Sequence, residues 1–302
     1  MSRPLYGAIE AGGTKFICAA GYGPTELGAS SRIDIPTSTP AVTLGQVTAF
    51  FQRLRGEGRS LAGIGVAAFG PLELDPRSRD WGRILATPKP GWSGVSLTEP
   101  LECLDCPIVI DTDVNAAALA EARLGAGLGA DPLAYVTVGT GIGGGVVIDG
   151  RSIKGMLHPE MGHIRVRRDA RDVDFGGTCP FHADCLEGLA SGPALVARWK
   201  SPVESWAPGH PGLEIAGGYL GQLAATIALM LSCERIVFGG GVMSSGRLLP
   251  FIREAAAREL NGYLPIEARA GGFEHYIVPA ALGRLAGLTG AMLLAGAPPP
   301  PA

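Results

Sequence analysis

Hydrophobic positions along this chain alternate between short continuous runs and helical spacing, and that alternation predicts an α/β protein. Apolar runs bounded by glycine, such as LYGAIEAGG at residues 5–13 and LAGIGVAAFG at 61–70, are typical of buried strands. Apolar residues three and four positions apart, as in TLGQVTAFFQRLR at 43–55, indicate a helix with one packed face. Further strands are predicted at 14–23, 31–35, 106–113, 234–241 and 275–280, and further helices at 114–127, 217–232, 247–260 and 285–296.

Two segments depart from this pattern. Residues 71–94 are rich in proline and glycine and too long for a plain connector, so we expect a functional or mobile loop there. The tail APPPPA, residues 297–302, is predicted to be disordered.

A glycine-rich hairpin opens each half of the chain. GAIEAGGTKFICAAG at residues 7–21 and YVTVGTGIGGGVVIDG at 135–150 are each predicted as a strand, a glycine turn and a second strand. Two such turns on either side of a cleft would present backbone N–H groups to the phosphates of a nucleotide. A pair of ordinary tight turns is the alternative, although the recurrence in both halves favours the phosphate site.

Three familiar motifs are rejected. Gly139, Gly141 and Gly144 satisfy GxGxxG, but a strand follows them, whereas a dinucleotide-binding turn opens a helix. The segment AGGTK lacks the ending of a P-loop. Cys103 and Cys106 form an isolated CxxC pair, which we interpret as ordinary thiols.

Composition narrows the class of protein further. The 302 residues suffice for about two domains, and the 46 glycines, against a usual share of ~7%, indicate many sharp turns or close approaches. A net charge of −3 gives no reason to expect nucleic acid or an anionic membrane as a partner, and we find no apolar run of the ~18 residues that a membrane span needs. Without a signal sequence, we expect a cytoplasmic protein whose six cysteines are thiols or metal ligands.

Asp113 follows the apolar strand PIVI at the point where a helix begins. Open α/β sheets bind ligands at the carboxyl ends of their strands, so a carboxylate there, near a phosphate site, could accept the proton of an attacking hydroxyl. The same position also suits a helix N-cap. The sequence leaves these two interpretations equally open.

A cluster of metal-ligand residues follows the second hairpin. Cys179, His182 and Cys185 form CxxHxxC, and His163 precedes them. Two thiolates and two imidazoles would neutralise Zn²⁺ and complete its tetrahedron, which leaves no position for a reactive water and predicts a structural site. The alternative is two reduced cysteines and two surface histidines.

Glu160 and Glu187 flank these ligands. If zinc fixes the loops, both carboxylates are held in place and can accept hydrogen bonds from a substrate rich in hydroxyl groups. The second ring nitrogen of a zinc-bound His163 must also donate to a partner, and a sugar oxygen would serve. For both glutamates, a solvated surface charge is the alternative.

Several motifs together resemble the ROK family of sugar kinases. They are GAIEAGGTKF, the step from Asp113 to Asn115, VGTGIGGGVV, HPEMGH, CPFHADCLEGLASGP and VFGGGVM, and they span about residues 6–290. The CxxHxxC form and the segment ATPKPGWSG resemble the bacterial fructokinase branch. The resemblance implies a two-domain α/β fold of actin-like or hexokinase-like (ribonuclease H-like) type, with ATP and Mg²⁺ in the cleft, usually as a homodimer. The domains would be 1–117 and 118–284, with a helix at 285–296 packed back on the first.

The resemblance also implies roles for individual residues. Asp113 would be the general base, and Glu160, His163 and Glu187 would contact sugar hydroxyls. Zinc would be held by His163, Cys179, His182 and Cys185. The nucleotide site would consist of Glu10, Gly12, Gly13, Thr14 and Lys15 from the first half and Thr140, Gly141, Gly239, Gly240 and Gly241 from the second.

Three features depart from the wider family. Glu10 stands where aspartate is usual, and its extra methylene leaves open a direct or a water-mediated link to Mg²⁺. Thr112 replaces a common asparagine, which weakens any assignment of a sugar contact at that position. Two cysteines and two histidines replace the commoner three and one, and this substitution points to the fructokinase branch.

The predicted activity is phosphoryl transfer from MgATP to the 6-hydroxyl of fructose. Glucose, mannose or an N-acetylhexosamine is the alternative substrate within the family. ROK relatives also include sugar-responsive repressors, but those carry an N-terminal helix-turn-helix, and here the first strand begins by residue 6. A catalytically silent sugar-binding protein is disfavoured by Asp113 and by both glycine hairpins.

Overall fold

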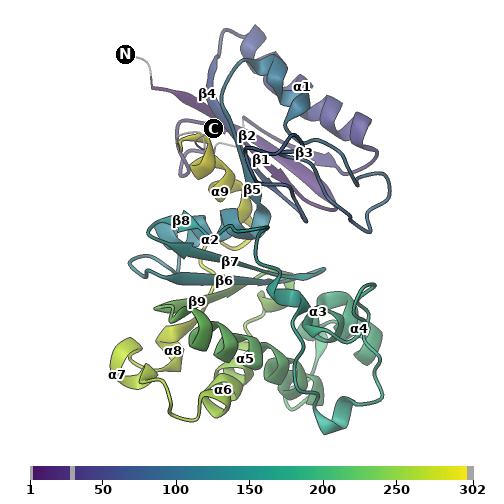
Figure 1. The fold of residues 1–302 in the computed structure, drawn as a ribbon, viewed down its shortest axis with the longest axis vertical. Coiled ribbons are helices and arrows are strands. Elements are labelled where there is room, and N and C mark those ends of the chain that lie inside the picture. Colours follow the sequence, from purple (N-terminus) through teal and green to yellow (C-terminus); the bar gives the residue numbers. More distant parts are fainter. Residues whose placement is uncertain (1–2, 28–30, 298–302) are drawn as a thin grey trace. The chain divides into compact units, whose positions relative to one another are not determined.

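The computed structural model describes residues 3–27 and 31–297, and the chain forms two compact units (Figure 1). The first unit runs to residue 120 and also takes in 152–158 and the C-terminal part from 285, while the second comprises 121–151 and 159–284. The proline-rich tail beyond residue 297, for which we predicted disorder, lies outside the described residues. Each unit contains one five-stranded sheet, so the α/β prediction is confirmed.

The sheet of the first unit has the strand order β3–β2–β1–β4–β5. Its strands are β1 (Leu5–Ala11), β2 (Lys15–Gly21), β3 (Arg32–Pro36), β4 (Leu61–Ala68) and β5 (Ile108–Thr112). β1, β4 and β5 run parallel, and β2 is antiparallel to both of its neighbours. The carboxyl ends of β1, β4 and β5 therefore share one edge of the sheet, where the first glycine turn and Asp113 also lie.

Helices α1 (Pro40–Gly56) and α9 (Ala286–Ala295) pack on opposite faces of this sheet (Figure 1). Ile64 of β4 belongs to the core that contains Phe51 of α1. The next residue, Gly65, faces the other way, because successive strand residues point to opposite sides. A Cβ added at Gly65 would lie 1.8 Å from the carbonyl oxygen of Ala291 in α9, so only glycine allows this close approach.

The long loop at residues 71–94 is anchored in the hydrophobic core. Leu72, Ile84 and Trp92 of this loop are fully buried. Trp92 packs against Phe16 of β2, with ring centroids 5.4 Å apart. The η2 turn (Glu99–Leu104) then leads into β5. Its apolar side chains therefore pack this loop against the first sheet.

The second unit is built on a sheet with the strand order β10–β9–β6–β7–β8. Its strands are β6 (Leu133–Val138), β7 (Ile142–Ile148), β8 (Arg151–Ser152), β9 (Arg235–Gly239) and β10 (Ile277–Pro279). Its helices are α3 (Leu186–Ala190), α4 (Gly192–Trp199), α5 (Pro211–Leu231), α6 (Leu249–Leu260), α7 (Ile266–Ala270) and α8 (Phe273–Tyr276), and α2 (Asp113–Leu124) begins in the first unit and ends here. β6 and β7 form the second predicted hairpin, and β9 runs parallel to β6.

Some predicted boundaries were wrong for local reasons. The strand predicted at 106–113 ends at Thr112, because Asp113 is already helical. The strand predicted at 275–280 begins as the helical turn α8. Helices α3, α4 and α7 were missed, because five to eight residues show too little periodicity to be recognised.

Helix α5 corrects one expectation drawn from the sequence. We expected no run long enough to cross a membrane, yet this helix of 21 residues meets that criterion by length and composition alone. In the structure, 67% of the apolar stretch of this helix is buried within the protein, and the helix packs against α6. This degree of burial is typical of a helix in the core of a folded unit.

Candidate active site and metal centre

The first glycine turn connects β1 to β2 in the first unit. The N–H of Gly12 donates to the carbonyl of Lys15 at 3.0 Å and closes the hairpin. Thr37 holds the turn from outside, because its hydroxyl donates to the carbonyl of Gly12 at 2.8 Å and its N–H to that of Thr14 at 2.9 Å. A Cβ added at Gly13 would meet no atom within 4 Å. Thr37 therefore holds the backbone of the turn, and there is open space beside the Cα of Gly13.

Two lysines lie near this turn, and they are engaged differently. The ammonium of Lys15 forms an exposed ion pair with Asp34 of β3, with Nζ and Oδ2 2.5 Å apart. The ammonium of Lys89 donates to the carbonyl of Gly13 in the turn itself. Lys89 was not predicted as a site residue, although it lies in the segment ATPKPGWSG that contributed to the family resemblance. Lys89 is therefore the lysine that contacts the predicted phosphate-binding turn.

Asp113 is the first residue of α2, directly after β5. The hydroxyl of Thr112 accepts the N–H of Asn115 at 3.1 Å, which is the bond that an N-cap side chain makes. Thr112 is therefore the N-cap of α2, and Asp113 is not. Asp113 Oδ1 accepts the N–H of Val114 at 2.8 Å, and burial raises the pKa of Asp113 to about 6. A carboxylate with a pKa closer to neutrality is a better proton acceptor.

Glu10, near the end of β1, is a second perturbed carboxyl group in the first unit. Burial, and next the negative charge of Asp113, raise the pKa of Glu10 to about 7. Glu10 Oε2 is buried and has no hydrogen-bond partner among the residues that the structure describes. Oxygen ligands from carboxylates are those that Mg²⁺ prefers, and a cation would relieve both the repulsion and the unpaired oxygen. The residues present therefore fit a magnesium ion.

The four predicted zinc ligands lie together in the second unit. One ligand atom from each of His163, Cys179, His182 and Cys185 lies within 4.8 Å of all the others. The two Nδ1 atoms are 3.3 Å apart, and His163 Nδ1 is 3.5 Å from Cys185 Sγ and 3.7 Å from Cys179 Sγ. A tetrahedron with Zn–N of ~2.0 Å and Zn–S of ~2.3 Å has edges of about 3.3–3.8 Å. The cluster fits Zn²⁺ in size as well as in donor type.

Glu187 connects the metal cluster to the second glycine turn. It lies in α3, which begins directly after Cys185. Glu187 Oε2 accepts the N–H of Ile142, the first residue of β7, at 2.9 Å. A Cβ added at Gly141 would lie 2.6 Å from the same oxygen, so the glycine makes room for the carboxylate. The second turn is thereby held by a residue whose own position depends on the cluster.

His163 and Glu160 lie on the short η3 turn (Met161–His163) and its N-terminal flank. The N–H of His163 donates to the carbonyl of Glu160 at 3.1 Å. Because Nδ1 of His163 faces the cluster, Nε2 is the ring nitrogen directed to other partners. Glu160 is exposed. This arrangement agrees with a histidine that binds metal on one side and a hydroxylated ligand on the other.

Gly239 is the last residue of β9 in the second unit, and Gly240 and Gly241 follow it. Gly239 is paired with Thr137 of β6, and Gly240 has a φ of +90°. β6 and β9 are parallel, so this glycine run and Thr140 of the second turn share the carboxyl edge of the sheet.

The predicted site residues thus fall into two groups. Glu10, Asp113 and the first turn belong to the first unit, and the metal cluster, the second turn and the glycine run belong to the second. Convergence of the two groups on one bound substrate stays a prediction.

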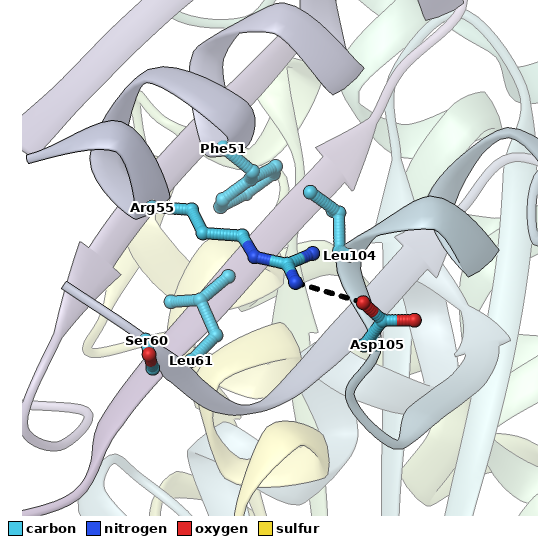
Figure 2. Close-up of a pocket in the computed structure, with 6 residues that line it drawn as sticks. All are labelled: Phe51, Arg55, Ser60, Leu61, Leu104 and Asp105. Atoms are coloured by element: carbon cyan, nitrogen blue, oxygen red, sulfur yellow. Dashed lines mark hydrogen bonds and ion pairs between the residues drawn. The ribbon is translucent and has the colours of Figure 1, made fainter. Parts of the chain in front are cut away.

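Two cavities lie away from these residues. The cavity in Figure 2, of about 90 Å³, contains the ion pair between Arg55 and Asp105, at 2.8 Å, and lies at the amino end of β4. In the second unit, a cavity of about 460 Å³ beside α5 and α6 is lined by ion-paired side chains such as Arg171 and Glu214, 2.7 Å apart. Neither cavity includes a predicted site residue.

Known structures place the fold among the sugar kinases. A ROK hexokinase from Thermus thermophilus superimposes with a TM-score of 0.75 at 29% identity, over 96% of this chain and 97% of that one. A ROK family glucokinase from Streptomyces griseus, solved with glucose and AMPPNP, gives 0.73 at 26% identity, over 96% and 99%. The actin-like sugar-kinase fold is therefore confirmed.

The chain belongs to the ROK family, which it matches over residues 6–297. A fructokinase from Zymomonas mobilis is 45% identical over 297 residues, with 97% of each chain covered. A fructokinase from Pediococcus pentosaceus is 38% identical, over 97% of this chain and 98% of the other. The family predicted from the motifs is confirmed.

Proposed function

We propose that this protein transfers the γ-phosphoryl group of ATP to a hexose, and that the hexose is D-fructose, phosphorylated at its 6-hydroxyl. Support comes from the full-length similarity to fructokinases and from the carboxyl edge of the first sheet. The observation that carries the proposal is Asp113, a strand-end carboxylate whose pKa burial raises to about 6.

In this proposal Asp113 is the general base. It accepts the proton of the sugar hydroxyl as that oxygen attacks the phosphorus, and the Pγ–O bond to ADP breaks. Bound Mg²⁺ supplies positive charge that offsets the charge on the phosphates, and Glu10 would hold it directly or through water. The fixed backbones of Gly12, Gly13 and Thr14 would approach the phosphates from the first unit.

The second unit would supply the other half of the nucleotide site and the sugar contacts. Thr140 and Gly141 would approach the phosphates, and the glycine run at 239–241 would border the adenosine. Glu160, Glu187 and His163 Nε2 would bond to sugar hydroxyls. Zn²⁺ would hold the loops that carry these residues. Its role would be structural, because four protein ligands leave no open position for a reacting water.

A coupled assay of ADP release with a panel of sugars tests this function. Fructose is expected to give the highest kcat/KM among fructose, glucose, mannose and N-acetylglucosamine, and ADP release without sugar is the control. Preference for another sugar of the panel would move the assignment within the family. Absence of sugar-dependent ADP release with every one of them would overturn the proposed kinase function.

We also propose a cytoplasmic homodimer. Cytoplasmic placement is supported by the need for ATP, and the dimer by the family resemblance. Light scattering of the purified protein, with and without zinc chelation, measures the mass directly. A monomer mass at assay concentrations would contradict the dimer.

A further inference from the structure

Asp111 is a fully buried carboxylate two residues before Asp113. It lies in β5 with no exposed surface. A buried charge is costly unless it is paired and fully hydrogen-bonded. Four donors surround Asp111, so both of its oxygens are satisfied.

Two of these donors fix the turn that carries Asp113. Asp111 Oδ1 accepts the N–H of Thr112 and the side-chain amide of Asn115, each at 2.8 Å. Thr112 and Asn115 stand on either side of Asp113 in the sequence and are joined by the N-cap bond of α2. The backbone on both sides of the proposed base is thus tied to Asp111.

The other two donors come from a different part of the chain. Asp111 Oδ2 accepts the hydroxyl of Ser152 at 2.6 Å and lies 3.0 Å from the ammonium of Lys154. Both residues belong to the segment 152–158, which is part of the first unit, although Ser152 is also the last residue of β8 in the second sheet. At its far end, His158 Nε2 accepts the N–H of Leu72 at 3.1 Å. The segment is therefore held in the first unit at both ends.

This segment leads directly into Pro159 and Glu160, the proposed sugar contact. One buried carboxylate therefore holds the turn of the base through Oδ1 and the approach to the sugar site through Oδ2. Among the residues that the structure describes, its cationic partner is Lys154, whose side chain is 36% exposed, so this lysine can be replaced without disturbing the core.

We propose that Asp111 and Lys154 form a positioning pair for phosphoryl transfer. They touch neither substrate in this role, and they act by holding the Asp113 carboxylate in its reactive orientation. The proposal rests on the proposed function of Asp113. Removal of Lys154 leaves Asp111 buried without its counter-ion. Because an unpaired buried charge is costly, the carboxylate is expected to reorient toward solvent and to release the turn that carries Asp113.

The test compares Lys154→Met with Lys154→Arg in the full-length enzyme, with Lys200→Met as control for loss of an exposed lysine. Lys154→Met is expected to lower kcat about 10- to 100-fold while the KM values for sugar and MgATP change less than about threefold, because misorientation of the base affects the transition state. Lys154→Arg, which keeps the charge, is expected to recover at least a third of wild-type kcat. Lys200→Met is expected to match the wild type.

Ser152→Ala is the second variant, because it removes one donor and retains the ion pair. If Lys154→Met fails to fold, Ser152→Ala is still expected to lower kcat about two- to fivefold at unchanged KM. Wild-type kcat in folded Lys154→Met, loss of activity through KM alone, or unchanged kcat in Ser152→Ala where Lys154→Met does not fold would overturn the positioning role. An inactive wild type would instead overturn the kinase function, so the two failures are distinguishable.

Discussion

Thr112 caps helix α2 by accepting the N–H of Asn115 on its hydroxyl at 3.1 Å. The residue between cap and helix body, Asp113, is thereby relieved of a capping role. Its carboxylate accepts the N–H of Val114 on Oδ1 at 2.8 Å.

Asp113→Asn is expected to lower kcat by about 10²–10⁴-fold, because an amide cannot accept the proton of the sugar hydroxyl. Sugar and nucleotide binding should persist, since the amide keeps the size of the carboxylate. Single-turnover kinetics measures the chemical step, and calorimetry measures binding. Wild-type kcat in this variant would refute the assignment of the base.

The pH dependence of kcat should show an acid limb near pH 6. Burial raises the pKa of Asp113 from 3.8 to about 6, so protonation removes the base as the pH falls through that value. Activity is therefore expected to be full above about pH 7 and to fall tenfold for each further pH unit below the pKa. A profile flat down to pH 4.5, with the coupling enzymes in excess, would contradict the raised pKa.

Removal of zinc should weaken both stability and sugar binding. Cys179→Ser or chelation opens the cluster that holds α3 and Glu187, so we expect a Tm lower by several degrees and a higher KM for the sugar. Metal analysis of active enzyme should find about one zinc per chain. Cys103→Ser, an exposed thiol outside the cluster, is the matched control. Full activity in protein without zinc would reject the metal centre.

The two lysines near the first turn should respond differently to replacement by methionine. Lys89 already donates to the carbonyl of Gly13, so Lys89→Met is expected to raise the KM for MgATP by roughly tenfold through loss of a charge near the phosphates. The ammonium of Lys15 forms an ion pair with Asp34, so Lys15→Met should raise the KM for MgATP less than Lys89→Met does. Steady-state kinetics at saturating sugar gives the KM for MgATP of both variants. A larger increase in Lys15→Met than in Lys89→Met would indicate that Lys15 is the lysine that binds the nucleotide.

Local patterns predicted much of the fold. Both glycine hairpins, the helix at α1 and the strand before Asp113 follow from the spacing of apolar residues and glycines, which reflects burial directly. The α5 helix was also predicted, but its length and apolar character were underestimated, because glycines interrupt its hydrophobic run. Short elements such as α3 were missed, although Glu187 lies on it.

Within the candidate site, residue type determined the metal cluster. CxxHxxC brings three candidate ligands close in any compact loop, and His163 was predicted as the fourth because it lies shortly before them; the fold brings it to the other three. The role of Lys89 could not be predicted, because 76 residues separate it from the carbonyl that it contacts. The same holds for Lys154, which reaches Asp111 from another segment of the chain.

The sequence by itself determined the class of fold, the two glycine turns, the cysteines and histidines of the candidate metal centre and the carboxylate at residue 113, because each depends on residues close together in the chain. Only the tertiary structure decided that Thr112 is the cap, that Glu187 supports the second turn, and that one buried carboxylate connects the proposed base to the segment before Glu160. The cap is a local bond between residues three apart, whereas the other two depend on contacts between distant segments, which exist only once the sheets have brought those segments together.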